Sequence, residues 1–186
     1  RALPAFLTAN DGHVTIHFDD SGAVSPVVVE PLLWTEQQVI MGGGPFQDHF
    51  GRAVAVDGDY MLVGSWPQSK PGKAAILHRS NGVWLGASGL TPSDSIGNQY
   101  DSFGYAVGIS GDVAMVTSQM LTKVYVYKRN GGVWPEVQKF QPSGWIPGTY
   151  PNFGKSISID GNTAIVGAPQ EATPGQSAGA AYVFVQ

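Results

Sequence analysis

The stretch from Phe153 to Asn162, Phe-Gly-Lys-Ser-Ile-Ser-Ile-Asp-Gly-Asn, occurs in similar form twice earlier in the chain. The earlier copies are residues 50–59, Phe-Gly-Arg-Ala-Val-Ala-Val-Asp-Gly-Asp, and residues 103–112, Phe-Gly-Tyr-Ala-Val-Gly-Ile-Ser-Gly-Asp. The phenylalanines are 53 and 50 residues apart, and in each copy a glycine follows the phenylalanine by eight positions. Self-similarity at a period of this size indicates a repeat architecture.

Each copy predicts a strand, a tight turn and a second strand. Residues 53–56 and 156–159 alternate small with β-branched side chains, the pattern of a strand with one buried face. Asp57-Gly58 and Ser110-Gly111 supply the positive φ that hairpin turns need. A short apolar run such as residues 61–64 then forms the second strand.

A third and a fourth strand complete the unit. The third strands are residues 74–77, 124–127 and 181–184, and the fourth open at Val83-Trp84 and Val133-Trp134, after a second glycine turn. Near the N-terminus, residues 14–17 align with 74–77 and Ser21-Gly22 aligns with Asn81-Gly82. The chain is therefore expected to begin with strands three and four of one repeat, and to end with strands one to three of the last. Thirteen strands and no helix are expected.

Four-stranded units of about 50 residues are typical of β-propeller blades. The sequence resembles the FG-GAP family, the blades of the integrin α-subunit N-terminal propeller and its relatives. The resemblance rests on Phe153-Gly154 together with Gly167-Ala168-Pro169, and on Phe50-Gly51 and Phe103-Gly104. It implies an all-β fold of four-stranded antiparallel FG-GAP-type blades, with an incomplete or partner-completed ring.

We expect a single FG-GAP-type propeller region over residues 1–186. It comprises a partial repeat at 12–46 and repeats at 47–99, 100–149 and 150–186. These repeats amount to about three blades, whereas propellers typically have four to eight.

Composition excludes several classes of function. Ten Lys and Arg against 14 Asp and Glu give a net charge of −4, which offers no basic surface for nucleic acid. The absence of cysteine excludes disulfides and thiolate chemistry. No apolar run reaches the length of a membrane span. The resemblance implies an extracellular or cell-surface location, or alternatively the lumen of an exported or organellar compartment.

Catalytic and cofactor motifs are absent from the sequence, so we expect no enzyme activity and no cofactor. There is no phosphate loop, dinucleotide fingerprint or Gly-x-Ser-x-Gly elbow. Some integrin-type blades carry a calcium loop of the Asp-x-Asp-x-Asp-Gly kind. That motif is absent here: Asp57-Gly58-Asp59 provides two carboxylates around a turn, and calcium takes six to eight oxygen ligands. A solvated hairpin tip is therefore expected, with a calcium site as the alternative.

Aromatic residues give the candidate contacts. Trp84 and Trp134 occupy equal repeat positions, so we expect them between blades, and the three repeat phenylalanines are expected in the core. Loop aromatics on a rigid scaffold are suited to gripping a ligand or partner. The candidate binding residues are Trp66, Tyr100, Trp145, Tyr150 and the loop residue His49.

Three functional hypotheses follow. The first is a non-enzymatic protein-binding, assembly or adhesion module, with protein partners or self-association, because unpaired edge strands favour pairing with another chain. The second is a lectin, in which loop tryptophans stack on a glycan. The third is an accessory propeller of a larger enzyme, with the chemistry outside this chain.

Overall fold

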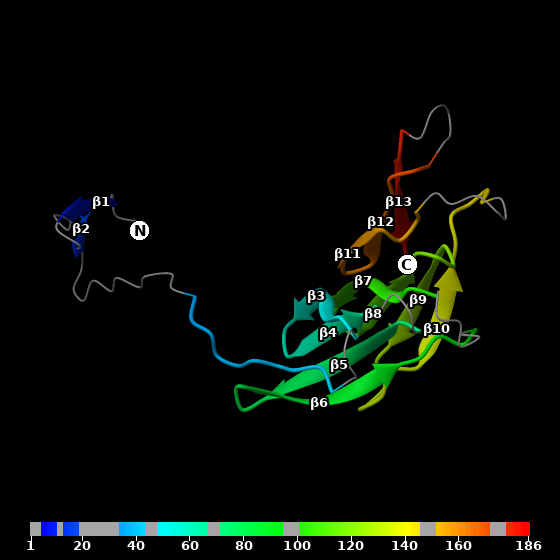
Figure 1. Ribbon diagram of the computed structural model, residues 1–186, viewed down its shortest axis with the longest axis horizontal. Helices are drawn as coiled ribbons and strands as arrows, with labels where there is room; N and C mark the ends of the chain where they lie inside the picture. Colours follow the sequence, from blue (N-terminus) through cyan, green and yellow to red (C-terminus); the bar gives the residue numbers. More distant parts are fainter. Residues whose placement is uncertain are drawn as a thin grey trace. The chain divides into compact units, whose positions relative to one another are not determined.

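The structure is a computed structural model that describes residues 5–10, 13–18, 34–43, 48–66, 71–94, 101–145, 152–171 and 178–186. The described residues form thirteen strands and no helix (Figure 1). The chain divides into two compact units, residues 1–37 and residues 38–186.

The N-terminal unit contains one hairpin. Strand β1 (Ala5–Asn10) pairs antiparallel with β2 (His13–Phe18). The predicted strand at residues 14–17 falls within β2, but its partner precedes it, so the expectation that the chain begins with strand three was wrong. The turn-forming pair Asp11-Gly12 is the signal for this hairpin in the sequence. The predicted turn at Ser21-Gly22 and the strand after it lie outside the described residues.

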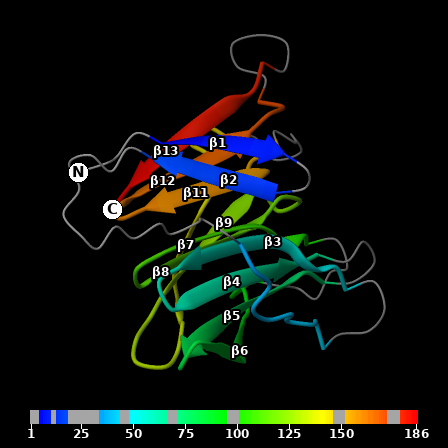
Figure 2. The same cartoon turned by 90° about the vertical axis from the view of Figure 1, so that its left-hand side faces the viewer.

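The second unit contains three antiparallel sheets in chain order. The first sheet comprises β3 (Phe50–Asp57), β4 (Tyr60–Ser65), β5 (Lys73–Ser80) and β6 (Val83–Leu90), which follow one another in Figure 2. The middle sheet comprises β7 (Phe103–Ser110), β8 (Val113–Ser118), β9 (Lys123–Lys128) and β10 (Glu136–Phe140). The last sheet comprises β11 (Ser156–Asp160), β12 (Thr163–Ala168) and β13 (Ala180–Val185).

The Phe-Gly pair forms a turn at the start of the first strand of each sheet. The residue before the phenylalanine has positive φ in all three cases, namely His49, Ser102 and Asn152. Its carbonyl oxygen accepts a hydrogen bond from the N–H three residues later, as in Arg52 N to His49 O at 3.1 Å. The glycine also has positive φ, 87° at Gly51, which side chains with a Cβ rarely adopt. This backbone geometry explains why a glycine follows the phenylalanine in each repeat.

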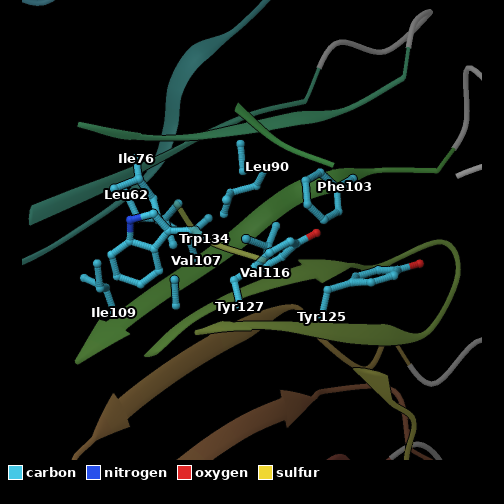
Figure 3. Packing of buried hydrophobic residues seen from close by; sticks show 12 residues of the cluster. Leu62, Ile76, Leu90, Phe103, Val107, Ile109, Val116, Tyr125, Tyr127 and Trp134 are labelled. Carbon is cyan, nitrogen blue, oxygen red and sulfur yellow. The ribbon is translucent and has the colours of Figure 1, made fainter. Parts of the chain in front are cut away.

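The core lies between consecutive sheets. One cluster joins the first sheet to the middle sheet, and it includes Leu62, Ile76, Phe103, Tyr127 and Trp134 (Figure 3). A second cluster, around Val124, Phe153 and Val166, joins the middle sheet to the last. Each sheet therefore buries its apolar faces against its neighbours in the chain, as stacked repeats do.

The expected structural aromatics divide by position. Phe103 and Phe153 are fully buried, and Trp134 packs edge-on against Tyr60 of the first sheet, with ring centroids 5.6 Å apart. Phe50 and Trp84 of the first sheet are only half-buried, so the expectation that Phe50 is core was wrong. Their counterparts are covered by a preceding sheet, whereas in the second unit no sheet precedes the first.

The fold class is as expected from the sequence. The described chain is all-β, and its sheets are antiparallel blades of a partial β-propeller. In the described residues the blades do not close a ring.

Candidate binding surfaces: a loop-end cluster and two open sheet faces

Three residues at the same repeat position form a row across the sheets. Arg52, Tyr105 and Lys155 each lie two residues after the repeat phenylalanine. Strand β7 contacts both β3 and the first strand of the last sheet, β11, so equivalent positions come side by side. Together with Trp66 and His49, these residues make up what we call the loop-end cluster.

Cations lie over aromatic rings in this cluster. The Arg52 guanidinium carbon is 4.7 Å from the centroid of the Trp66 ring and 5.6 Å from that of Tyr105. The Lys155 ammonium is 5.1 Å from the Tyr105 centroid, and the Trp66 and Tyr105 centroids are 5.0 Å apart. Contacts of this length between a cation and an aromatic face are attractive. The two cations are thus held at one tyrosine ring.

Among the described residues, no carboxylate neutralises the charge of the cluster. The described chain contains five ion pairs, and they use the cations Lys73, Arg79, Lys123, Arg129 and Lys139. Arg52 and Lys155 are exposed, and in the described part of the chain neither has a carboxylate partner. The cluster is therefore a positive spot on a protein whose net charge is negative.

The structure brings together two of the five residues predicted from the sequence. His49 is exposed, and its Nδ1 is 3.2 Å from the carbonyl oxygen of half-buried Trp66. Trp145 belongs to another loop, a turn after β10 in which its N–H donates to the Pro142 carbonyl at 3.3 Å. Tyr100 and Tyr150 lie outside the described residues. The role of these five residues in binding stays a prediction.

Sequence reasoning missed Arg52, Tyr105 and Lys155. The three residues differ in type, so no motif marks them. The usable signal was their equal distance from the repeat phenylalanine, because equal repeat positions on stacked sheets become neighbours in space.

The second candidate surface lies on the faces of the sheets. We call the face toward the preceding sheet the leading face, and the face toward the following sheet the trailing face. On the leading face of the middle sheet, Val107 is 6% exposed. Its counterpart in the first sheet, Val54, is 70% exposed, and Val56 is similarly open. The leading face of the first sheet therefore exposes Val54 and Val56, although Val63 and Leu77 on the same face are buried.

The trailing face of the last sheet is open in the same way. On the trailing face of the first sheet, Ile76 is 3% exposed and Leu62 is fully buried. Their counterparts in the last sheet are Val183, which is 63% exposed, and its cross-strand partner Ile165. Solvent-exposed apolar side chains that gather on one face of a sheet are a feature of interaction surfaces.

Hydrogen bonds link the hairpin tips of consecutive sheets. Asp57 Oδ2 accepts a bond of 2.6 Å from the Gly111 N–H. One repeat later, Ser110 Oγ accepts a bond of 3.1 Å from the Gly161 N–H. The second carboxylate of the Asp57-Gly58-Asp59 turn, Asp59, pairs with Arg79 at 2.9 Å.

The first and middle sheets each have an aspartate two residues before the repeat phenylalanine, and the two aspartates differ in their hydrogen-bond partners. Asp101 Oδ1 accepts the N–H of Gly72 from the first sheet at 2.9 Å and the N–H of Phe103 at 3.2 Å. The counterpart of Asp101 in the first sheet is Asp48. Its Oδ1 is buried and has no hydrogen-bond partner among the described residues. A buried carboxylate oxygen without a donor is costly.

The loop after β6 is held to the middle sheet by Asp94. Its carboxylate is 2.5 Å from Lys123 Nζ and 3.0 Å from Lys139 Nζ, and it accepts a bond of 2.7 Å from the Tyr125 hydroxyl. Burial alone would raise the pKa of Asp94, but these donors together hold that pKa well below its ordinary value. Burial and the neighbouring carboxylate raise the pKa of Tyr125.

A scan against protein families matches the family described as FG-GAP repeat at residues 34–75 and 134–184. The two segments make up half of the chain. The chain belongs to the FG-GAP repeat family. Repeats of this family are of the non-enzymatic binding or adhesion type and are typical of extracellular proteins. A search of curated proteins finds no match.

Both matched segments begin at a tryptophan, Trp34 and Trp134. Trp34 is almost fully exposed, whereas Trp134 is buried. In the described part of the chain, no helix is long and apolar enough to cross a membrane.

Proposed function

We propose that this chain is a non-enzymatic protein-binding module that uses the loop-end cluster to contact an acidic segment of a protein partner. The observation that carries the proposal is the pair of exposed cations, Arg52 and Lys155. Both lie over the Tyr105 ring, and neither has a carboxylate partner in the described chain. The chain acts as a subunit of a larger extracellular or cell-surface assembly.

The geometry of the cluster favours a carboxylate-bearing partner. A guanidinium group can donate two parallel hydrogen bonds to one carboxylate, and these charge-assisted bonds are strong. Arg52 is already positioned by the Trp66 ring, so less side-chain freedom is lost when it binds. Tryptophan, tyrosine and arginine are also the residues that dominate the energy of protein interfaces.

The contacts of Trp66 favour protein binding over glycan stacking. A lectin site needs an aromatic face that is free to stack on a sugar ring. The Trp66 ring is covered by the Arg52 guanidinium at 4.7 Å and flanked by Tyr105. We therefore expect Trp66 to position Arg52 for the partner.

Native mass spectrometry of the chain isolated from its source tests this function. We expect a stoichiometric complex heavier than the 19.6 kDa chain, containing a second polypeptide. The double variant Arg52→Ala, Lys155→Ala is expected to weaken that complex by at least tenfold, roughly 1.4 kcal/mol or more. Binding of the unaltered chain should also weaken as salt is raised, since exposed charges are screened.

Lys128→Ala is the matched control. Lys128 is exposed, lies outside the cluster and is likewise absent from the ion pairs of the described chain. Its removal should leave the complex intact. A complex that survives the double variant unchanged would refute the proposed contact.

A further inference from the structure

We propose that the acidic segment bound by the loop-end cluster is an extended stretch of polypeptide with two carboxylates, at positions i and i+2. One carboxylate pairs with Arg52 and the other with Lys155. This inference rests on the proposed function and adds the spacing of the charges and the backbone conformation of the partner. The geometry around Tyr105 carries both additions.

The two cations of the cluster reach Tyr105 from the two sheets that flank it. Arg52 belongs to β3 of the first sheet and Lys155 directly precedes β11 of the last sheet, whereas Tyr105 lies on β7 of the middle sheet. Strand β7 contacts both β3 and β11. Trp66, also from the first sheet, lies beside Tyr105 with the ring centroids 5.0 Å apart. The cations therefore come from opposite sides of the middle sheet, and each takes its own carboxylate.

The distances to the Tyr105 ring limit the separation of the two charges. The Arg52 guanidinium carbon is 5.6 Å and the Lys155 ammonium 5.1 Å from the ring centroid, so the two groups are at most about 11 Å apart. In an extended strand, residues i and i+2 lie on one face about 6.6 Å apart. Residues i and i+1 point to opposite faces, and residues i and i+4 are about 13 Å apart. The i, i+2 spacing is therefore the one that serves both cations.

Side-chain amides beside Lys155 favour an extended backbone over a helix. Asn152 lies in the same turn, and its carbonyl oxygen accepts the Lys155 N–H at 3.1 Å. The Asn152 side chain accepts a hydrogen bond from Gln119 and donates one to Gln170. This row of amides carries donors and acceptors that match the unpaired N–H and C=O groups of an extended chain. A helix has already paired those groups within itself.

Three labelled peptides of identical composition test the spacing. Each contains two aspartates and five glycine or serine residues, with the aspartates at i and i+1, at i and i+2, or at i and i+4. Fluorescence anisotropy at low ionic strength measures their binding to the purified full chain. Because the net charge of the peptides is the same, non-specific attraction contributes equally to all three. We expect the i, i+2 peptide to bind about fivefold more tightly than the others, the effect of one additional exposed ion pair.

Variants of the chain test the assignment of each cation. Arg52→Ala and Lys155→Ala each leave one cation, so each is expected to remove the preference for the i, i+2 peptide while keeping weak, salt-dependent binding of all three. Lys128→Ala is the matched control and should keep the preference. Asn152→Gly removes the amide and tolerates the positive φ of 53° at this position. We expect it to weaken the i, i+2 peptide about threefold without changing the salt dependence.

The outcomes separate this inference from the proposed function. Equal affinities for the three spacings, or no binding of the i, i+2 peptide, would overturn the inference. The proposed function would still stand if the native complex were weakened by salt and by the double variant Arg52→Ala, Lys155→Ala. Tighter binding of the i, i+4 peptide would overturn the extended conformation, because residues i and i+4 lie together on a helix. Peptide binding that is unchanged in the double variant would overturn the inference and the proposed contact together.

Discussion

The first strands of the first and middle sheets have similar sequences but opposite environments. Val54 and Val107 occupy the same strand position, and one is largely exposed while the other is buried. Phe50 and Phe103 differ in the same direction. The cause is the neighbouring sheet, since the first sheet covers the middle one.

This difference shows that the stability of a sheet depends on its neighbours as well as on its own residues. Apolar burial supplies most of the favourable free energy of folding, and here it is obtained between sheets. The middle sheet packs against a sheet on both faces, whereas the first and last sheets each expose valines on one face. Those valines are where further burial would gain the most.

Substituting the repeat phenylalanines should give the largest effect. Phe103→Ala removes a buried ring that packs edge-on against Tyr125 at 5.5 Å, and we expect a loss of about 3–5 kcal/mol in the free energy of unfolding. Phe50→Ala, at a half-buried ring, should lose roughly half of that or less in the single chain.

Urea unfolding of the two variants under the same conditions measures this difference. Equal losses would show that Phe50 is covered as completely as Phe103 and would remove the contrast between the sheets. A Phe50→Ala loss that grows with protein concentration would sharpen the contrast, because association would then be burying that ring.

An intermediate effect is expected at the loop that ties the first sheet to the middle one. Asp94→Asn weakens the bonds from Lys123, Lys139 and Tyr125, and should cost about 1–3 kcal/mol. Asp59→Asn, which breaks an exposed pair with Arg79, is the control and should cost about 1 kcal/mol or less.

The pH dependence of stability has a defined sign at Asp94. Its pKa in the folded chain is lowered from the ordinary value of 3.8, so the carboxylate stabilises the fold above that pH. This contribution is lost as pH falls below 3.8 toward the folded-state pKa. Thermal unfolding should therefore show a gap between the unaltered chain and Asp94→Asn that is constant near neutral pH and narrows in acid. A gap that widens in acid would contradict this.

The hairpin tips should give the smallest effect. Asp57→Ala removes the acceptor of the Gly111 N–H at an exposed site, and we expect a loss of about 0.5–1.5 kcal/mol. Asp160→Ala, at the equivalent position of the last sheet, is the control and should be close to neutral, because its carboxylate accepts no hydrogen bond among the described residues. Calorimetric unfolding of the two variants measures the difference.

The sequence by itself determined the repeat and its strands. Turn glycines and alternating apolar residues act through neighbours in the chain, so the pattern at residues 50–59 is sufficient to place β3, the turn and the start of β4. The hairpin β1–β2 was the exception. Residues 14–17 were recognised as a strand, but Ala5–Asn10 carries little alternation, so its pairing was missed.

The tertiary structure alone decided which repeat residues are buried and which meet. Val54 and Val107 are interchangeable as local sequence, and only the presence or absence of a preceding sheet separates them. The loop-end cluster arises in the same way, because Arg52, Tyr105 and Lys155 belong to three repeats far apart in the chain. Burial and the proximity of charges depend on which surfaces pack together, and the sequence of one strand does not specify which strand or sheet packs against it.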